Sequence, residues 1–173
     1  MTVRTDDGPR SALRFPWGFG LVYGGLAYVA GYLATLLLTL TGSFDAATLG
    51  GHLRVAGYAF YGAHGVPVAD TNFTTLVAAG GGAPELAYWL VPLVVLAVAG
   101  LGMARGYVGV SAQQAVLAGA AVATGYALTT LMGVVGFEGP DGLAPDPLVS
   151  LALMGLAYPF LLGGLGGYLS TRL

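Results

Sequence analysis

Cysteine and lysine are both missing from this chain of 173 residues, and charged residues of either sign are scarce. Without cysteine there can be no disulfide, no zinc–cysteine site and no thiol catalysis. Charged residues make up 8% of the chain, against about 25% in an ordinary soluble domain. A soluble protein of this size could not cover its surface with so few charges, so the composition favours an integral membrane protein.

Four long runs contain neither a charged residue nor a histidine: 15–44, 86–104, 106–137 and 147–171. Each reaches or nearly reaches the ~20 apolar residues that cross a bilayer. Lipid offers no hydrogen-bond partners to the backbone, so each run should be helical. We therefore predict an all-α polytopic membrane protein with four transmembrane helices. Their expected bounds are about 15–41, 84–104, 111–135 and 148–170.

The polar residues 1–14 precede the first run and are expected to form a cytoplasmic tail. The run that follows is much longer than the apolar region of a signal peptide, so we predict that it is retained as a membrane helix. Residues 15–173 are then one four-helix transmembrane domain. Within it, Ser111 and Gln114 have the spacing of a capping box that opens the third helix.

An aromatic-rich stretch that includes both histidines separates the first two expected helices. Residues 46–64 have an apolar stripe interrupted by polar side chains, which predicts an amphipathic helix. The segment is too short and too interrupted to cross the bilayer, so we expect it to lie on the outer membrane surface. Gly65 and Pro67 should end it.

This expected outer helix holds the candidate contact residues Arg54, Tyr61 and His64. Their aromatic and polar groups would suit a docking surface, and simple packing against the bundle is the alternative. No metal site is predicted, because His52 and His64 are twelve residues apart, about 18 Å along a continuous helix. No cofactor motif or catalytic constellation is present either, so we expect no cofactor and no enzymatic activity.

Small residues recur at helical spacing within three of the four expected membrane helices. Such residues let helix backbones approach closely, and packing within one chain is favoured here over a homodimer seam. The expected packing positions are Gly20, Gly24 and Gly31 in the first helix, Gly125 in the third, and Gly163 and Gly167 in the fourth.

Asn72, Phe73 and Thr74 form an N-glycosylation sequon. Tripeptides of this kind also arise by chance. However, this one lies between the first two expected membrane helices. The division of arginines between the two sides, described below, places that loop outside the cell. Asn72 is therefore a candidate glycosylation site.

The arginines divide unequally between the two sides of a four-helix layout. Five fall on one side and only Arg54 on the other; the five are Arg4, Arg10, Arg14, Arg105 and Arg172. Because positive residues favour the cytoplasmic side, the chain is predicted to be a multi-pass cell-membrane protein with both termini in the cytoplasm.

Two sequence segments and the arginine-bearing tail resemble a family of small haloarchaeal four-helix integral membrane proteins of unknown function. The segments are Phe15-Pro-Trp-Gly and Gly57-Tyr-Ala-Phe-Tyr-Gly-Ala-His64. A basic set made only of arginine, together with acidic loops, also favours a halophilic archaeon. The resemblance implies a four-helix fold and a location in the membrane, and it implies no activity.

The sequence gives the architecture well and the function poorly. No ionisable residue lies within an expected helix core, which argues against ion-coupled transport. The favoured interpretation is a structural or accessory component of the cell membrane. The alternative is a small passive channel or facilitator for ions or small solutes. The expected partners are the lipid bilayer and either another membrane protein or a second copy of the chain, with no nucleic acid.

The predicted topology can be tested with single cysteines placed at Ser11, Thr74, Gly106 and Gly142. On intact cells, an impermeant thiol reagent should label positions 74 and 142, because these lie in the loops expected outside. Labelling at 11 or 106 instead would contradict the topology.

Overall fold

The described residues of the computed structural model are 17–44, 48–68, 72–80, 82–107, 111–139 and 142–173. They are helical apart from short connections and one isolated β-bridge between Val68 and Pro145. The elements in chain order are α1 (Trp17–Thr39), α2 (Leu49–Gly62), α3 (Phe73–Gly80), α4 (Glu85–Arg105), α5 (Ala112–Ala120), α6 (Ala123–Gly136), α7 (Pro147–Val149), the π-helix η1 (Ser150–Ala157) and α8 (Tyr158–Leu169). The expected tail, residues 1–14, lies outside the described residues.

Four stretches of the described chain are long and apolar enough to cross a membrane. They are Trp17–Thr39, Glu85–Arg105, Ala112–Gly136 and Pro147–Leu169. This confirms the prediction of an all-helical fold with four helices of spanning length. The third stretch is α5 followed by α6, and the fourth is α7, η1 and α8 joined end to end.

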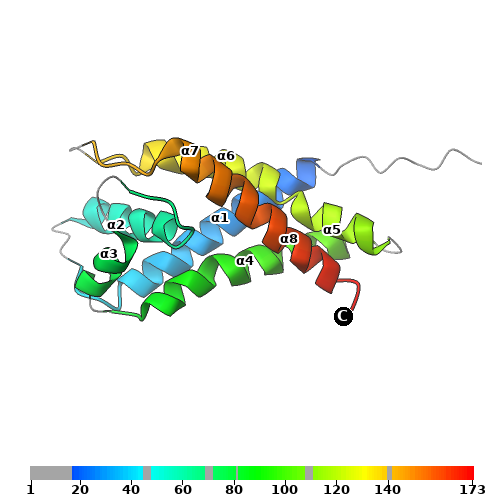
Figure 1. Ribbon diagram of the computed structural model, residues 1–173, viewed down its shortest axis with the longest axis horizontal. Coiled ribbons are helices and arrows are strands. Elements are labelled where there is room, and N and C mark those ends of the chain that lie inside the picture. The colour runs from blue at the N-terminus through cyan, green and yellow to red at the C-terminus, as the bar shows by residue number, and fades with distance from the viewer. Residues whose placement is uncertain (1–16, 45–47, 69–71, 81, 108–110, 140–141) are drawn as a thin grey trace, which may run out of the picture.

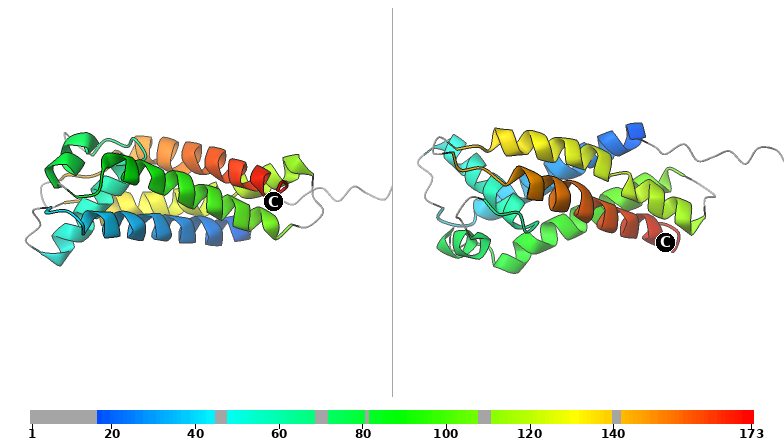
Figure 2. Two further views of the ribbon diagram at one scale, coloured as in Figure 1. Left: turned by 90° about the horizontal axis from the view of Figure 1, so that it is seen from below. Right: turned by 45° about the horizontal axis from the view of Figure 1, so that its top comes forward.

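The four stretches form an elongated bundle, with the two short helices α2 and α3 gathered at one end (Figures 1 and 2). We call this the α2/α3 end. The opposite end, here called the C-terminal end, holds the start of α1, the end of α4 and the C-terminus (Figure 1). Large apolar side chains such as Leu26, Leu37 and Val98 are exposed along the sides of the bundle, where lipid would cover them.

Glycines bring α1 and α6 into backbone contact. A Cβ atom on Gly24 would clash with the carbonyl oxygen of Val122, and one on Gly125 would clash with that of Leu21. Gly20 meets the carbonyl oxygen of Ala121 in the same way. Because backbone atoms cannot swing aside as side chains do, these positions hold the two helices at the shortest possible separation.

Glycines also seat α8 against its two neighbours, α4 and α5. A Cβ on Gly163 would meet the carbonyl oxygen of Gly119 at 2.6 Å. One on Gly167 would clash with the carbonyl oxygen of Ala115, and one on Gly166 with that of Ala97. The fourth spanning stretch is therefore fixed on two sides by contacts that leave no room for a side chain.

Two of the four spanning stretches are not regular α-helices throughout. The third begins with the predicted capping box, in which Ser111 and Gln114 each bond the other's backbone, and it is interrupted at 121–122. The fourth contains the eight-residue π-helix η1. Pro159 is the second residue of α8, which begins directly after η1. It has no N–H to give to the carbonyl of Gly155, so α-helical bonding is broken there.

The position of α2 differs from the expected helix lying on the outer surface. Its first residues are exposed, whereas residues 59–64 are buried. Phe60, Tyr61 and His64 pack against α1, α6 and α8, and the alanines at 59 and 63 pack against α3 and α4. Helix α2 thus enters the bundle from the α2/α3 end. Small residues make this possible: Gly57 leaves room for the ring of Phe137, and Gly62 for the ring of Phe73.

Helix α3 was not expected from the sequence, which suggested a polar and glycine-rich connection there. Phe73 packs edge to face on Tyr88 and Trp89 of α4, with ring centroids 6.2 and 5.3 Å away. Val77 is buried against the same helix. These aromatic contacts supply the burial that a segment of eight residues lacks by itself.

Replacing Gly24 with alanine should lower thermal stability in detergent, because the added methyl group meets the backbone of α6. Overpacking of this kind costs about 1–3 kcal/mol. The neighbouring Gly25 is a matched control, since its Cβ would find its nearest neighbour, Thr129 Cγ2, at an ordinary 3.8 Å. Gly25→Ala should therefore melt at or above the wild-type temperature. Equal melting of the two variants would show that the α1–α6 contact does not limit stability.

Candidate functional site

The described bundle encloses one group of polar side chains at the inner end of α2. We call Tyr28, Tyr61, His64 and Tyr126 the buried polar cluster. Tyr28 is 8% exposed and the other three are not exposed at all. The cluster joins α1, α2 and α6, and it is the largest concentration of buried polar side chains that the structure describes.

The end of α2 places His64 in the cluster. Gly65 adopts a left-handed conformation (φ 74°), and the N–H groups of Val66 and Gly65 bond back to the carbonyls of Tyr61 and Gly62. This pattern is a Schellman motif, which favours glycine at the left-handed position. It closes the turn that follows the last residue of α2, Gly62, and holds His64 inside that turn. The chain leaves the helical direction at Gly65, as predicted.

Both nitrogen atoms of the His64 imidazole have partners. Nδ1 lies 2.7 Å from the carbonyl oxygen of Phe60, which only accepts, so Nδ1 carries the hydrogen and donates. Nε2 lies 2.9 Å from the hydroxyl of Tyr126. In the neutral ring Nε2 accepts, and Tyr126 is therefore the donor. The imidazole thus links the end of α2 to α6.

A second set of bonds ties α2 to both α1 and α6. The Tyr61 hydroxyl donates to the backbone carbonyl of Thr130 in α6. Since its only hydrogen is used there, Tyr61 accepts from the hydroxyl of Tyr28 in α1, 3.2 Å away. Each hydroxyl of this pair is therefore satisfied inside the protein, as burial requires.

Aromatic rings close the cluster off from solvent. Phe60 packs edge to face on Tyr28 and on His64, with ring centroids 5.2 and 4.9 Å apart. On the opposite side of the imidazole lies Tyr158 of α8, at 5.2 Å. Edge-to-face pairs of this kind contribute about 0.5–1.5 kcal/mol each beyond the area that they bury.

Burial determines the charge state of the site. It lowers the pKa of the His64 imidazole to about 4, and the hydrogen bond to Phe60 opposes this only in part. Burial likewise raises the pKa of the Tyr61 phenol. At neutral pH both groups are therefore uncharged, and the hydrogen bonds described above are those of the neutral forms.

The cluster does not combine the groups that catalysis requires. Its four side chains bond to one another and to backbone carbonyls, with no carboxylate among the partners that the structure describes. Elsewhere in the described interior, four buried hydroxyl oxygens lack a hydrogen-bond partner: those of Thr35, Tyr88, Thr130 and Ser150. Within the described ranges, no three His, Cys, Asp or Glu side chains lie close enough to hold a metal ion.

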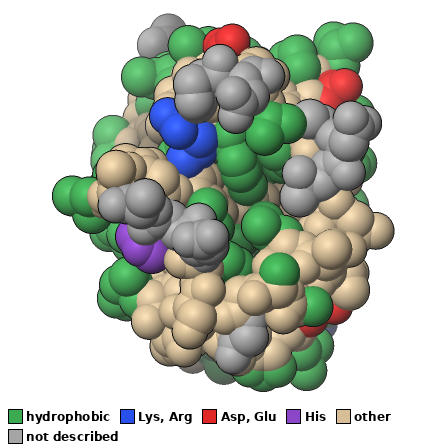
Figure 3. Space-filling view, turned by 90° about the vertical axis from the view of Figure 1, so that its left-hand side faces the viewer, with side chains coloured by type: hydrophobic (Ala, Val, Ile, Leu, Met, Phe, Trp, Pro, Cys, Tyr) green, Lys and Arg blue, Asp and Glu red, His purple; other side chains and the backbone are tan. Residues whose placement is uncertain are grey.

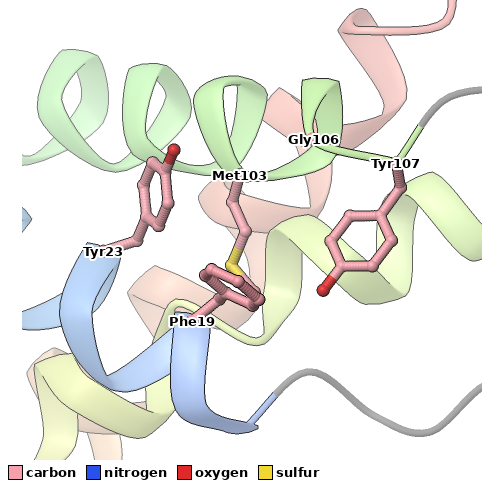
Figure 4. Close-up of a pocket in the computed structure, with 5 residues that line it drawn as sticks. All are labelled: Phe19, Tyr23, Met103, Gly106 and Tyr107. Carbon is pink, nitrogen blue, oxygen red and sulfur yellow. The ribbon is translucent and has the colours of Figure 1, made fainter.

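The described pockets are mainly apolar. One at the C-terminal end has a volume of about 180 Å³ and is lined by Phe19, Tyr23, Met103, Gly106 and Tyr107. Figure 4 shows the Phe19 ring beside the Met103 sulfur, with Tyr107 reaching across from the end of α4. A second, of about 420 Å³, is a shallow groove between α1 and α4, lined entirely by Ala, Leu and Val side chains. Neither lining includes a carboxylate, a histidine or an arginine.

The three residues expected to form an outer docking surface do not lie on one surface. Tyr61 and His64 are fully buried in the polar cluster, which corrects that prediction. Their polar groups form hydrogen bonds inside the bundle. The small residues around them leave the space in which α2 is inserted. Arg54 is half-buried on the outer part of α2, near Gly139. Asn72 is exposed and lies just before α3.

Two members of the cluster, Tyr28 and Tyr126, were not singled out from the sequence. A signal was present, since each lies deep within a spanning stretch, well away from both of its ends. Tyrosine in membrane helices is enriched at the interfaces, and a buried phenol needs a hydrogen-bond partner. A tyrosine deep in an apolar run therefore points to a polar contact between helices.

Fold and site together define an all-helical protein with the four long, apolar helices of a multi-pass membrane protein and a closed polar core. The chain belongs to the family described as Family of unknown function (DUF7978), which matches residues 1–173. No curated protein and no solved structure matches the chain. The family relation agrees with the resemblance to a family without known function. The haloarchaeal origin stays a prediction.

The depressed pKa of His64 predicts that the protein loses stability in acid. Between about pH 6.5 and pH 4 the unfolded chain binds a proton at this histidine and the folded chain does not. Stability should therefore fall as pH decreases through this window, by about 3 kcal/mol from this group. The measurement is the melting temperature in detergent at pH 7.5 and pH 4.5.

His64→Gln should be less stable than the wild type at pH 7.5, since its amide does not reproduce both imidazole bonds, and it should lose less on acidification. His52→Gln is the matched control, because His52 lies on the same helix but outside the cluster. Carboxyl groups titrate in all three proteins and cancel in the comparison. Equal acid losses in the wild type and His64→Gln would refute the assignment.

Proposed function

We propose that this protein is a non-enzymatic structural or accessory component of the cell membrane. In this proposal the four spanning helices cross the bilayer and both termini are cytoplasmic. The function is to present a rigid, closed bundle to lipid and to a neighbouring membrane protein or a second copy of the chain. The observation that carries the proposal is the closure of the interior by backbone contacts at glycine.

The close packing of the helices favours a rigid structural component over a channel or facilitator. Where α1 meets α6, and along α8, carbonyl oxygens of the neighbouring helix fill the space in which a glycine lacks a side chain. At these described positions the contacts leave no open path between the helices. The polar cluster is saturated by its own hydrogen bonds and is shielded by aromatic rings. A channel or facilitator needs a path lined by polar groups, whereas the pockets at the sides of the described bundle are apolar.

The distribution of charge supports the proposed orientation. Arg105 and Arg172 lie at the C-terminal end, and the described acidic residues Glu85, Glu138 and Asp146 lie at the α2/α3 end. Figure 3 looks onto the α2/α3 end and shows acidic, basic and histidine side chains scattered among apolar and backbone atoms. Among the described residues, the C-terminal end holds arginine and no acidic side chain, as suits the cytoplasmic side.

Solute flux through proteoliposomes tests the proposal against the alternative of a facilitator. Purified protein is reconstituted, and the release of K⁺, Cl⁻ and glycerol is followed by stopped-flow and electrode measurements. Empty vesicles of the same lipid are one control, and vesicles containing Gly25→Ala are a second. We expect rates equal to those of empty vesicles. A tenfold faster release of any solute would replace the proposal with the facilitator.

The accessory role itself requires a partner. Crosslinking in native membranes, followed by purification and mass spectrometry, should give a defined complex with a second membrane protein or a dimer. Gly24→Ala, which alters the fold rather than the surface, should reduce the complex in proportion to its loss of folded protein. A protein recovered only as an uncrosslinked monomer would contradict the accessory role.

A further inference from the structure

Asn72 occupies an exposed position at the α2/α3 end, directly before helix α3. It is the only asparagine in the chain, and Thr74 completes the sequon Asn-Phe-Thr. The side chain at the central position, Phe73, is turned inward against Tyr88 and Trp89. The two outer residues of the tripeptide, Asn72 and Thr74, are both exposed.

The local geometry leaves the amide nitrogen of Asn72 available. The side-chain oxygen Oδ1 accepts a hydrogen bond from the backbone N–H of Thr74 at 3.0 Å. The backbone oxygen of Asn72 accepts from Leu76. The nitrogen Nδ2 makes no hydrogen bond to the described residues, so a group attached to it would break none of the hydrogen bonds described here.

Capping does not explain why asparagine stands at this position. The bond from Oδ1 to Thr74 N–H is a helix cap, and serine, threonine or aspartate would serve as well. Asn72 differs from these alternatives in having an amide nitrogen, and it lies two positions before Thr74, as a sequon requires. The chain has no other asparagine. The Thr74 hydroxyl donates to Glu85 Oε1 at 3.1 Å, a contact that serine could also make.

We infer that Asn72 is an N-glycosylation site whose saccharide projects from the α2/α3 end of the bundle. The inference rests on the orientation in the proposed function, because the saccharide is added on the outer side of the membrane. A modification of this kind is bulky and solubilising, and it belongs on an exposed loop. Helix α3, which is anchored on α4 through Phe73, holds the saccharide away from the spanning helices.

The modification requires a co-reactant, a saccharide linked through phosphate to a membrane lipid, and a separate transferase. The Asn72 Nδ2 atom forms a bond to the anomeric carbon of the saccharide and loses one proton. The bond between that carbon and the phosphate oxygen breaks, and the lipid phosphate leaves. No electron transfer takes place, and the peptide backbone is unchanged.

The test is the intact mass of the protein purified from the membranes of its native host. We expect the wild type to exceed its polypeptide mass of 17.4 kDa by one or more sugar residues. Peptide sequencing should locate the added mass at Asn72. Asn72→Asp removes the acceptor nitrogen but keeps an oxygen for the Thr74 cap, so this variant should fold normally and carry no added mass.

Thr74 supplies a second pair of matched variants. Thr74→Ser keeps the hydroxyl and should retain the modification, whereas Thr74→Ala should lose it. Melting temperatures of all three variants and of the wild type in detergent establish that each one folds. Added mass that persists in Asn72→Asp, or a wild type that has only its polypeptide mass, would overturn the inference.

Labelling distinguishes failure of the inference from failure of the orientation. A single cysteine at Thr75, which is exposed on α3, is treated with an impermeant thiol reagent on intact cells. An unmodified wild type with a labelled Cys at this position would overturn the glycosylation alone. An unmodified wild type labelled only after lysis would overturn both the glycosylation and the proposed orientation.

Discussion

The absence of a Cβ atom at a few helix positions is the constraint on which the bundle depends. At Gly20, Gly24 and Gly125 the backbones of α1 and α6 touch directly, and α8 is held in the same way against α4 and α5. In lipid the hydrophobic effect does not drive helices together, so close van der Waals contact must do so. Backbone contact is also the least forgiving kind, because carbonyl oxygens have no other rotamer to adopt.

Helix α2 is inserted into this closely packed bundle. A short helix that enters the bundle adds polar backbone groups to an apolar interior, where unsatisfied groups cost several kcal/mol. Nearby groups satisfy the carbonyls at the inner end of α2. The Schellman motif at Gly65 provides N–H donors to the last carbonyls of α2, and the His64 imidazole donates to the carbonyl of Phe60. Tyr61 and Tyr126 then bond α2 to its neighbours, so the polar cluster adds directional bonds to the apolar packing of the inner half of α2.

The buried polar cluster and the exposed α2/α3 end differ in their access to solvent. The polar cluster is uncharged at neutral pH and buried, and its hydrogen bonds specify how α2 packs against α1 and α6. The α2/α3 end carries half-buried Arg54, exposed Asn72 and the described acidic residues. These side chains and the apolar sides of the bundle lie on its outside, whereas the polar cluster is buried.

The sequence by itself determined the number and approximate bounds of the spanning helices, the capping box at Ser111 and the turn at Gly65 that follows α2. These follow from charge-free length and from local backbone chemistry, which neighbouring residues decide. Only the tertiary structure decided that α2 enters the bundle, that α3 forms on the rings of α4, and that Tyr28 and Tyr126 meet Tyr61 and His64. An amphipathic stripe has the same pattern whether it faces lipid or a protein interior. How deeply α2 is buried therefore depends on contacts with glycines and aromatic rings that are distant in the sequence.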